Sequence, residues 1–242
     1  NTFGAHEIII ETPDHVKNLS TLPESQIIQA LTVYQARIRE LEHDERFRYT
    51  IIFRNQRPAM PERFGHSHSQ VAGLPLIPKV VKEELGAAEY HFKIKERCIY
   101  CDIARQEQDQ KERVIESRDG YLTFVPYSAR FPFETMILPL RHRHDFMDVP
   151  PDELAALAGP LKRALHRVET LLDDPALVVC LHTSPYLRPR EGYWLSIRED
   201  YHWHIEILPM VTEVFGFEWS TGFHMQPVLS EALAAKLREV AG

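Results

Sequence analysis

The sequence predicts an α+β fold built from two similar halves, each with antiparallel strands and one long helix. Each half opens with a strand followed by a proline and a histidine, as Pro-x-His in the first half and Pro-x-x-His in the second, continues with a helical pattern and closes on a His-x-His pair. These signals run from Glu7 to His68 in the first half and from Glu134 to His204 in the second. Because the same signals recur in the same order, we expect a duplicated domain whose halves join edge to edge.

In the first half, the apolar residues 7–12 predict a strand, and Pro23 suits the first turn of the helix that follows. The helix is predicted from an apolar stripe at helical spacing, formed by Ile27, Ile28, Leu31, Tyr34, Ile38 and Leu41. Residues 49–53 are β-branched and aromatic, so they predict the next strand, and a loop then leads to a strand at 66–71.

In the second half, the same reasoning predicts strands at 121–126, 133–139, 176–182 and 201–208, a helix at 152–172, and a short helix at 231–240 capped by Ser230. Residues 72–97 contain prolines and charged runs and are expected to form the crossover between the halves. We therefore place the boundary near Ala88, which gives domains at residues 1–88 and 89–242.

Two features stand in front of the second copy of the pattern, namely the pair Cys98 and Cys101 and an additional strand at 121–125. The first copy lacks both, because the sequence begins at Asn1, close to its first strand. We therefore expect the N-terminal part of the first repeat to be missing from this chain.

The composition is that of a globular protein, with 242 residues of which 44% are apolar and 26% charged. No stretch approaches the ~20 apolar residues of a membrane helix and no leader pattern opens the chain, so no membrane partner is expected and the predicted location is cytoplasmic. The net charge of −7 argues against a nucleic-acid partner. Three cysteines, two of them spaced as Cys-x-x-Cys, fit a reducing compartment.

Cys98 and Cys101 predict a metal site, because a two-residue spacer lets both thiolates reach one tetrahedral centre. Zinc needs two further nitrogen or sulfur ligands, and the repeat pattern indicates His142 and His202 as the candidates. The alternatives are a chance spacing or a redox pair, with His202 as a hydrogen-bonded structural histidine.

The run His66-Ser-His68-Ser-Gln70 is the sharpest motif of the chain. Alternate residues of a strand share a face, so both imidazoles are expected to point the same way. By the repeat pattern, His15 and His66 are candidate ligands of a second metal site, whose cysteines would lie in the missing segment. A metal-bound His66 would leave His68 free to attack a phosphorus atom, with Gln70 donating to a phosphate oxygen. The alternative is that both rings are structural.

In this set of motifs the chain resembles the galactose-1-phosphate uridylyltransferases, a family within the histidine-triad superfamily. The resemblance spans nearly the whole chain and rests on an ordered set of segments. These are residues 7–15, Asn55 eleven residues before His66, the His-x-His-x-Gln core, and residues 131–135, 138–142, 180–185 and 202–209. The resemblance implies two histidine-triad-like repeats, each with an antiparallel sheet and one long helix.

The resemblance also implies a nucleotidyltransferase of galactose metabolism that moves a nucleoside monophosphate between a UDP-sugar and a hexose 1-phosphate in two steps. His68 matches the family's nucleophile, which attacks the α-phosphorus and carries the nucleotide covalently. Gln70 and Asn55 match residues that hold the phosphate oxygens, and His15 and His66 match zinc ligands. Splitting one displacement into two easier ones suits imidazole, which attacks well when neutral and leaves easily when protonated.

Two further implications concern the second half. Residues 215–223 resemble a family segment that reaches a sugar in the partner subunit, which implies a homodimer with Glu218 as the acceptor of a sugar hydroxyl; the alternative is that this aromatic cluster packs in the core. Some family members bind a metal at positions that match Glu84, His182, His202 and His204. Because thiolates favour a soft metal, we expect zinc at the cysteine set, with iron as the alternative metal at a second site.

The loop between Asn55 and His66 departs from the family, which has small residues there. In this chain the loop holds two prolines, which remove N–H donors, and the charged residues Arg57, Glu62 and Arg63, of which the arginines could bind phosphate. Three interpretations therefore stay open. They are a hexose-1-phosphate uridylyltransferase, a related enzyme such as a phosphorylase that splits an ADP-sugar with phosphate, and a catalytically silent nucleotide-binding paralogue.

Overall fold

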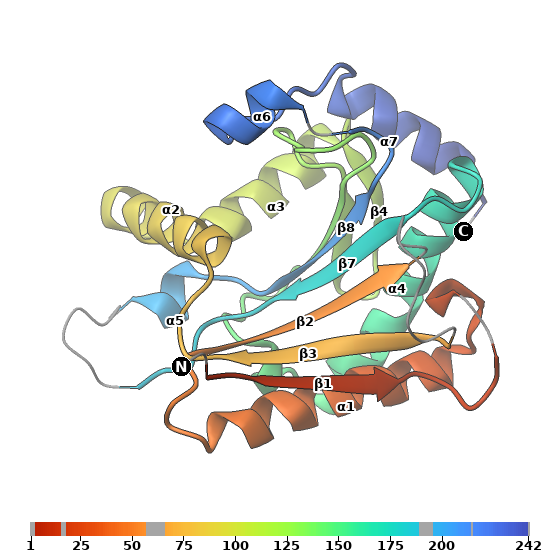
Figure 1. The fold of residues 1–242 in the computed structure, drawn as a ribbon. Helices are drawn as coiled ribbons and strands as arrows, with labels where there is room; N and C mark the ends of the chain where they lie inside the picture. The colour runs from red at the N-terminus through yellow and green to blue at the C-terminus, as the bar shows by residue number, and fades with distance from the viewer. Residues whose placement is uncertain (1–2, 16–17, 57–65, 189–195, 214, 242) are drawn as a thin grey trace.

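The computed structural model describes residues 3–15, 18–56, 66–188, 196–213 and 215–241. At its centre is one eight-stranded sheet, in the order β1-β3-β2-β7-β8-β6-β5-β4 (Figure 1). Its strands are β1 (Ala5–Ile10), β2 (Tyr49–Gln56), β3 (His68–Leu74), β4 (Val114–Arg118), β5 (Tyr121–Phe124), β6 (Thr135–Pro139), β7 (Leu177–His182) and β8 (His204–Pro209). Every pair of neighbouring strands is antiparallel, which confirms the predicted α+β class.

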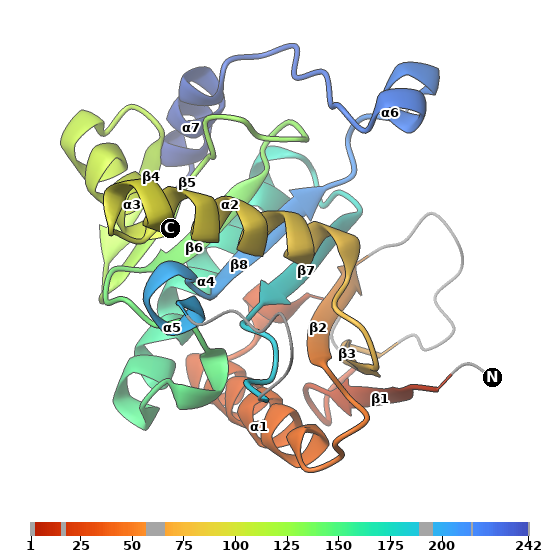
Figure 2. The same ribbon diagram turned by 90° about the vertical axis from the view of Figure 1, so that its left-hand side faces the viewer.

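Helices cover both faces of this sheet (Figures 1 and 2). They are α1 (Glu24–Glu42), α2 (Lys79–Lys95), α3 (Ile99–Gln110), α4 (Pro151–Leu171), α5 (Ile197–Asp200), α6 (Gly216–Thr221) and α7 (Ser230–Glu239), with the 3₁₀ turns η1 (Leu19–Thr21) and η2 (Phe146–Asp148). The larger core lies between the sheet and α1 and α4, and a second core lies on the opposite face under α2, α3 and α5. Within the described residues, no helix is both long and apolar enough to cross a membrane.

The first long helix, α1, forms where its apolar stripe predicts it. Ile27, Leu31 and Ile38 are at most 1% exposed, and they share one buried cluster with Leu157 and Leu165 of α4. Each such aliphatic side chain contributes about 1.5–3 kcal/mol when it is fully buried. The two long helices therefore fix one face of the sheet.

The segment predicted as the crossover between the halves contains a regular helix, α2. Val81, Leu85 and Ala88 recur at helical spacing and are at most 1% exposed, because this stripe packs on the second face of the sheet. The prolines of this segment precede the helix, and Pro78 is its N-cap residue. Since α2 runs through position 88 and one sheet spans the chain, the division into residues 1–88 and 89–242 stays a prediction.

Two smaller elements also differ from expectation. Strand β4 was not predicted, and it joins β5 through the two-residue turn Asp119-Gly120, in which both residues have positive φ, as hairpin turns require. Ser230 was expected to cap the last helix, but it is the first residue of α7, and its hydroxyl donates to the Pro126 carbonyl over 2.7 Å.

The strand order reads outward from the centre in the same way in both halves. In the first half β2 is followed by β3 and β1, and in the second half β7 is followed by β8 and β6. The two halves meet where β2 pairs with β7, with Phe53 opposite Cys180. This order is what a duplication predicts, and the additional strand β5 extends the second half beyond β6 as expected.

We had expected both His-x-His pairs to lie wholly within strands, and they do not. Strand β3 begins at His68 and β8 at His204, so His66 and His202 precede them. The reason is a shared local geometry, in which the second histidine donates its Nδ1–H to the carbonyl of the first, over 2.7 Å from His68 and 3.1 Å from His204. These carbonyls therefore accept from a side chain at the point where each strand starts.

A buried carboxylate next to the sheet makes the stability of the fold depend on pH. Asp145 accepts hydrogen bonds from the Met147 backbone N–H over 2.8 Å and from the Thr183 hydroxyl over 2.9 Å. Burial raises its pKa from 3.8 to about 6. The folded state then binds this proton more readily than the unfolded state, so the protein loses stability as pH rises from about 4 to 6.

We predict that Asp145→Asn raises the free energy of unfolding at pH 8 by on the order of 1–3 kcal/mol, because the amide keeps an acceptor oxygen without a buried charge. Urea unfolding at pH 8 and pH 5 measures the effect, and the gain should shrink toward pH 5. Asp109→Asn, an exposed site on α3, is the matched control. A gain that is equal at both pH values would contradict the assignment.

Candidate functional site

The candidate nucleophile lies on the face of the sheet opposite α1 and α4. His68 opens β3, and Gln70 follows on the same face because strand residues alternate. Gln70 pairs with Ile8 of β1 on one side and with Phe53 of β2 on the other. If the pairing of β2 with β3 is continued for two residues beyond Phe53, Asn55 lies opposite His68. The structure therefore brings together the three residues predicted to hold and attack a phosphate.

Hydrogen bonding fixes the tautomer of His68. Its Nδ1 lies 2.7 Å from the His66 carbonyl oxygen, which can only accept. Nδ1 therefore carries the proton, and Nε2 keeps the lone pair that a nucleophile needs. The ring is half-buried, so it is held in place without being sealed in the core.

A buried carboxylate on the other face of the sheet anchors the strand that carries His68. The hydroxyls of Ser67 and Ser69 both donate to Glu11, the former over 2.5 Å, and the Arg54 guanidinium donates to it over 3.2 Å. The Glu11 side chain has no exposed surface, so these donors replace its water shell. We had not predicted this network, although two serines that alternate with histidines beside an acidic residue in an apolar strand are a signal for it.

The candidate metal site of the first half is represented by two histidines. The rings of His15 and His66 lie edge to face with their centroids 5.3 Å apart. His66 donates its Nε2–H to the Thr12 carbonyl over 2.6 Å, which leaves Nδ1 available as a ligand atom. Within the described part of the chain, no cluster of three metal-binding side chains includes this pair, so it makes half of a site.

The cysteine set predicted in the second half comes together as a compact cluster. The ligand atoms of Cys98, Cys101, His142 and His202 all lie within 4.8 Å of one another. Sγ of Cys101 is 3.4 Å from Nδ1 of His142 and 3.6 Å from Nδ1 of His202. Zn–S and Zn–N bonds of about 2.3 and 2.0 Å at a tetrahedral angle give edges of about 3.5 Å. The cluster therefore fits zinc before any rearrangement.

The surroundings of this cluster support metal binding. His142 donates its Nε2–H to the Arg198 carbonyl over 2.9 Å, which leaves Nδ1 to face the thiols, as is usual for metal-bound histidine. The Cys98 thiol and the two imidazoles lower the pKa of Cys101, so one thiolate is favoured without a metal. Burial lowers the pKa of His202, which keeps that ring neutral and able to bind.

A second compact cluster lies on the neighbouring part of β7 and β8. It consists of Glu84, His182, His204 and Glu206, whose ligand atoms also lie within 4.8 Å of one another. The alternative set that we had considered contained His202, but this residue lies with the cysteines, and Glu206 takes the fourth place. Glu206 was missed because a single glutamate in an apolar strand usually indicates a solvent-facing position.

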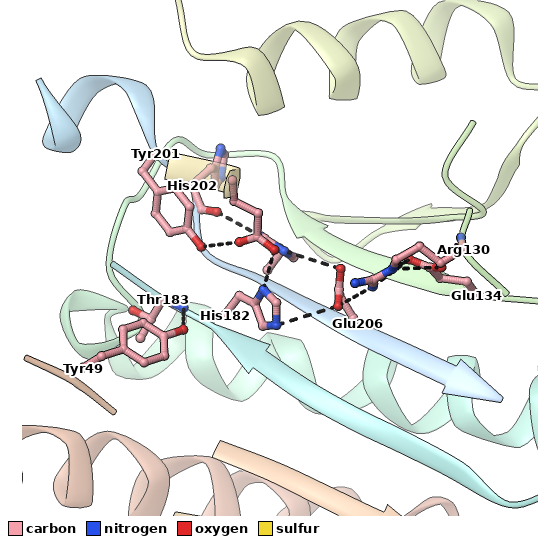
Figure 3. A network of polar contacts seen from close by, with 10 residues as sticks. Tyr49, Arg130, Glu134, His182, Thr183, Tyr201, His202 and Glu206 are labelled. Atoms are coloured by element: carbon pink, nitrogen blue, oxygen red, sulfur yellow. Dashed lines mark hydrogen bonds and ion pairs between the residues drawn. The ribbon is translucent and has the colours of Figure 1, made fainter. Parts of the chain in front are cut away.

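The second cluster is part of a buried ion network (Figure 3). His182 lies 2.8 Å from a Glu84 oxygen and 3.7 Å from Glu206, and Arg130 pairs with Glu206 over 2.7 Å. Burial alone would lower the pKa of His182, but hydrogen bonds to Cys180 and Glu84 and the nearby carboxylates raise it to about 10. Two carboxylates and two imidazoles suit iron or zinc, but His182 must lose its proton before it can bind.

The spacing of strands separates this cluster from the nucleophile. Gln70 pairs with Phe53, Phe53 with Cys180, and Cys180 with Glu206, so one row of side chains crosses β3, β2, β7 and β8. Three strand spacings of about 4.8 Å put Gln70 and Glu206 on the order of 14 Å apart. A metal at Glu206 would therefore not touch a phosphorus atom held by His68 and Gln70.

Glu218 and the loop before His66 are two further predicted features. Glu218 belongs to α6, which projects from the body of the molecule, and its carboxylate accepts from the Phe215 backbone N–H over 3.2 Å (Figure 2). The structure does not bring it near His68. The loop residues Arg57, Glu62 and Arg63 lie outside the described residues.

We predict that Cys98→Ser removes most of the bound zinc and lowers the unfolding temperature, because a structural metal contributes directly to folding. Metal analysis by mass spectrometry together with thermal unfolding measures both effects. Cys180→Ser removes a thiol that belongs to neither cluster and is the matched control, with zinc content unchanged. Wild-type zinc content in Cys98→Ser would contradict the assignment.

Comparison with known proteins places this geometry in a family. Residues 84–240 match the C-terminal domain of galactose-1-phosphate uridyl transferases. An ADP-glucose phosphorylase of Arabidopsis thaliana is 31% identical over 99% of this chain, and the chain spans 65% of that relative. The galactose-1-phosphate uridylyltransferase of Thermotoga maritima is 26% identical over 98% of the chain and 74% of the relative.

Solved structures agree with these sequence matches. The structure of an Arabidopsis thaliana ADP-glucose phosphorylase with bound ADP-glucose superposes with a TM-score of 0.89 at 30% identity, over 99% of this chain and 74% of that one. A uridylyltransferase structure superposes with a TM-score of 0.88 at 29% identity, over 98% and 75% of the two chains. With the C-terminal domain matched over residues 84–240, the chain belongs to the galactose-1-phosphate uridylyltransferase family.

Proposed function

We propose that this protein is a nucleotidyltransferase that takes a nucleoside monophosphate from a nucleotide sugar onto His68. The observation that carries the proposal is the bond from His68 Nδ1–H to the His66 carbonyl, which leaves Nε2 as the nucleophilic atom on the face shared with Gln70. The same bond holds His204, but that ring is 1% exposed, whereas His68 is half-buried and can be reached by a substrate.

The reaction balances without an external acid or base. The Nε2 lone pair attacks the α-phosphorus, an N–P bond forms, and the bond from that phosphorus to the bridging oxygen breaks, so that the sugar 1-phosphate leaves with the electron pair. In the second step a phosphate oxygen of the acceptor attacks the same phosphorus, and the N–P electrons return to Nε2. The His66 carbonyl stabilises the positive charge that the ring gains in the intermediate, because it accepts from Nδ1–H.

Gln70 and Asn55 are proposed to hold the non-bridging phosphate oxygens during both steps. Their side-chain amides are donors without charge. Gln70 lies two residues from His68 on the same face of β3, and Asn55 lies on the neighbouring strand β2. Such donors stabilise the transition state when they are already in place, since no reorganisation is then needed as negative charge builds on the phosphate.

The donor and acceptor distinguish two candidate reactions. The first is exchange of uridylate between a UDP-sugar and a hexose 1-phosphate, which the galactose-1-phosphate uridylyltransferases among the relatives support. The second is phosphorolysis of an ADP-sugar, which the 31% identical ADP-glucose phosphorylase supports.

Metals and assembly complete the proposal. Zinc on the cysteine cluster would stabilise the fold, and iron or zinc is proposed at the cluster around Glu206. Because that cluster is about 14 Å from Gln70 by strand spacing, a metal bound there takes no part in the phosphorus chemistry. A homodimer in the cytoplasm, with Glu218 serving the partner's site, stays our proposal for the assembly.

We predict that brief incubation with UDP-glucose or ADP-glucose adds the mass of one nucleoside monophosphate to the intact protein. His68→Ala should abolish this adduct without unfolding the protein, because no other group can replace the Nε2 lone pair at that position. Intact-mass spectrometry with each sugar identifies the base, and loss of the adduct on adding a hexose 1-phosphate or inorganic phosphate identifies the acceptor.

His43→Ala is the matched control for this experiment, because His43 is an exposed histidine at the end of α1. It should form the adduct at the wild-type rate. An adduct that persists in His68→Ala would overturn the nucleophile assignment, and a protein that holds its metal but gains no mass with either sugar would favour the catalytically silent nucleotide-binding paralogue.

A further inference from the structure

We infer that His6 is a positioning residue that sets the orientation of the Gln70 amide for phosphate binding. This inference rests on the proposed nucleotidyl transfer and adds to it a residue on the edge strand β1. His6 makes no direct contact with the reacting atoms in this scheme, and it acts through Gln70.

The contact is a specific one between two neighbouring strands. His6 Nε2 lies 2.8 Å from Gln70 Oε1. In the antiparallel register His6 pairs with Ala72 and Ile8 pairs with Gln70, so His6 is the diagonal neighbour of Gln70 on the same face. Diagonal neighbours lie about 7–8 Å apart at Cα, a distance that two long polar side chains can bridge.

The chemistry of the two groups fixes the direction of the bond. An amide oxygen can only accept, so His6 donates through its Nε2–H. With Oε1 engaged, the two N–H donors of Gln70 are free for phosphate oxygens. Turned by 180°, the same amide would present its oxygen, and an oxygen dipole facing an anionic phosphate is repulsive. With its proton on Nε2, His6 thus favours the productive one of two nearly isosteric orientations.

No other group performs this task in the part of the chain that the structure describes. The bond from His6 is the one hydrogen bond that the Gln70 side chain makes among the described residues. His6 itself is exposed and lies outside both cores, so its ring is not needed to fill the interior. A role in orienting Gln70 explains a polar aromatic side chain on an edge strand whose neighbours on the same face are Ile8 and Ile10.

The test measures the rate of adduct formation on His68 in the intact protein by rapid-quench mass spectrometry, at saturating UDP-glucose or ADP-glucose. His6→Phe keeps an aromatic ring but removes the donor, and the rate should fall about tenfold, the effect of losing one hydrogen bond between neutral groups. The half-saturating concentration of the sugar nucleotide should change less than twofold. His6→Gln restores an N–H donor and should recover most of the rate.

A double-mutant cycle separates action through Gln70 from an independent effect. In a Gln70→Ala background, His6→Phe should cause less than a twofold further loss, because the amide that His6 orients is gone. If the rate losses of the two single substitutions multiply in the double variant, the inference is overturned. It is also overturned by a His6→Phe rate equal to that of wild type, or by a His6→Gln rate as low as that of His6→Phe.

The proposed function and this inference fail in different ways. Absence of an adduct in the wild-type protein overturns the nucleotidyl transfer itself. A normal wild-type adduct with an unaffected His6→Phe rate overturns only the role of His6. An NMR spectrum adds a readout without activity, because the side-chain amide signals of Gln70, identified by their loss in Gln70→Ala, should shift in His6→Phe, and unshifted signals would refute the contact.

Discussion

The pairing of β2 with β7 is the constraint on which the rest of the structure depends. It joins the three strands of the first half and the five strands of the second into one sheet, with Phe53 opposite Cys180 at the junction. Because the register of each strand pair fixes which residues are aligned on the next strand, this single pairing also sets the row of paired residues that runs from Gln70 across the sheet to Glu206. A slip of one residue at the junction would send one half's polar side chains to the opposite face. The candidate nucleophile and the second metal cluster therefore occupy one surface.

Burying charge on both sides of this sheet has a cost that the hydrogen-bond networks offset. Glu11 has no exposed side-chain surface and is matched by two serine hydroxyls and Arg54. Glu206 is matched by Arg130 and His182 on the other face. An unpaired buried carboxylate would cost several kcal/mol, so each network fixes the backbone next to a functional histidine more strictly than apolar packing could.

Periodicity and motif order predicted much of this architecture from the sequence. The stripe of α1 and the alternating strands follow from burial, and the cysteine cluster follows from spacing that a metal requires. The helix within the crossover at 72–97 was not predicted, because Pro75 and the charged runs obscured the three buried positions of α2. Glu206 could not be recognised either, since a carboxylate in an apolar strand is taken as solvent-facing until its buried partners are known. Two ligand sets competed for His202, and only the fold shows that it lies with the cysteines.

The two His-x-His pairs show how one local geometry can serve two purposes. In both pairs the second ring donates Nδ1–H to the carbonyl of the first, so His68 and His204 present equivalent Nε2 atoms. His204 is 1% exposed, because Tyr100 of α3 stacks on it with ring centroids 5.1 Å apart.

The helices that cover the second half also contribute a charged side chain. Glu84 of α2 reaches the same cluster through its bond to His182. A nucleotide cannot approach a ring sealed in this way, whereas His68 stays half-buried. The difference between a nucleophile and a ligand thus lies in the helices that cover the strand, and the histidine motif alone does not decide it.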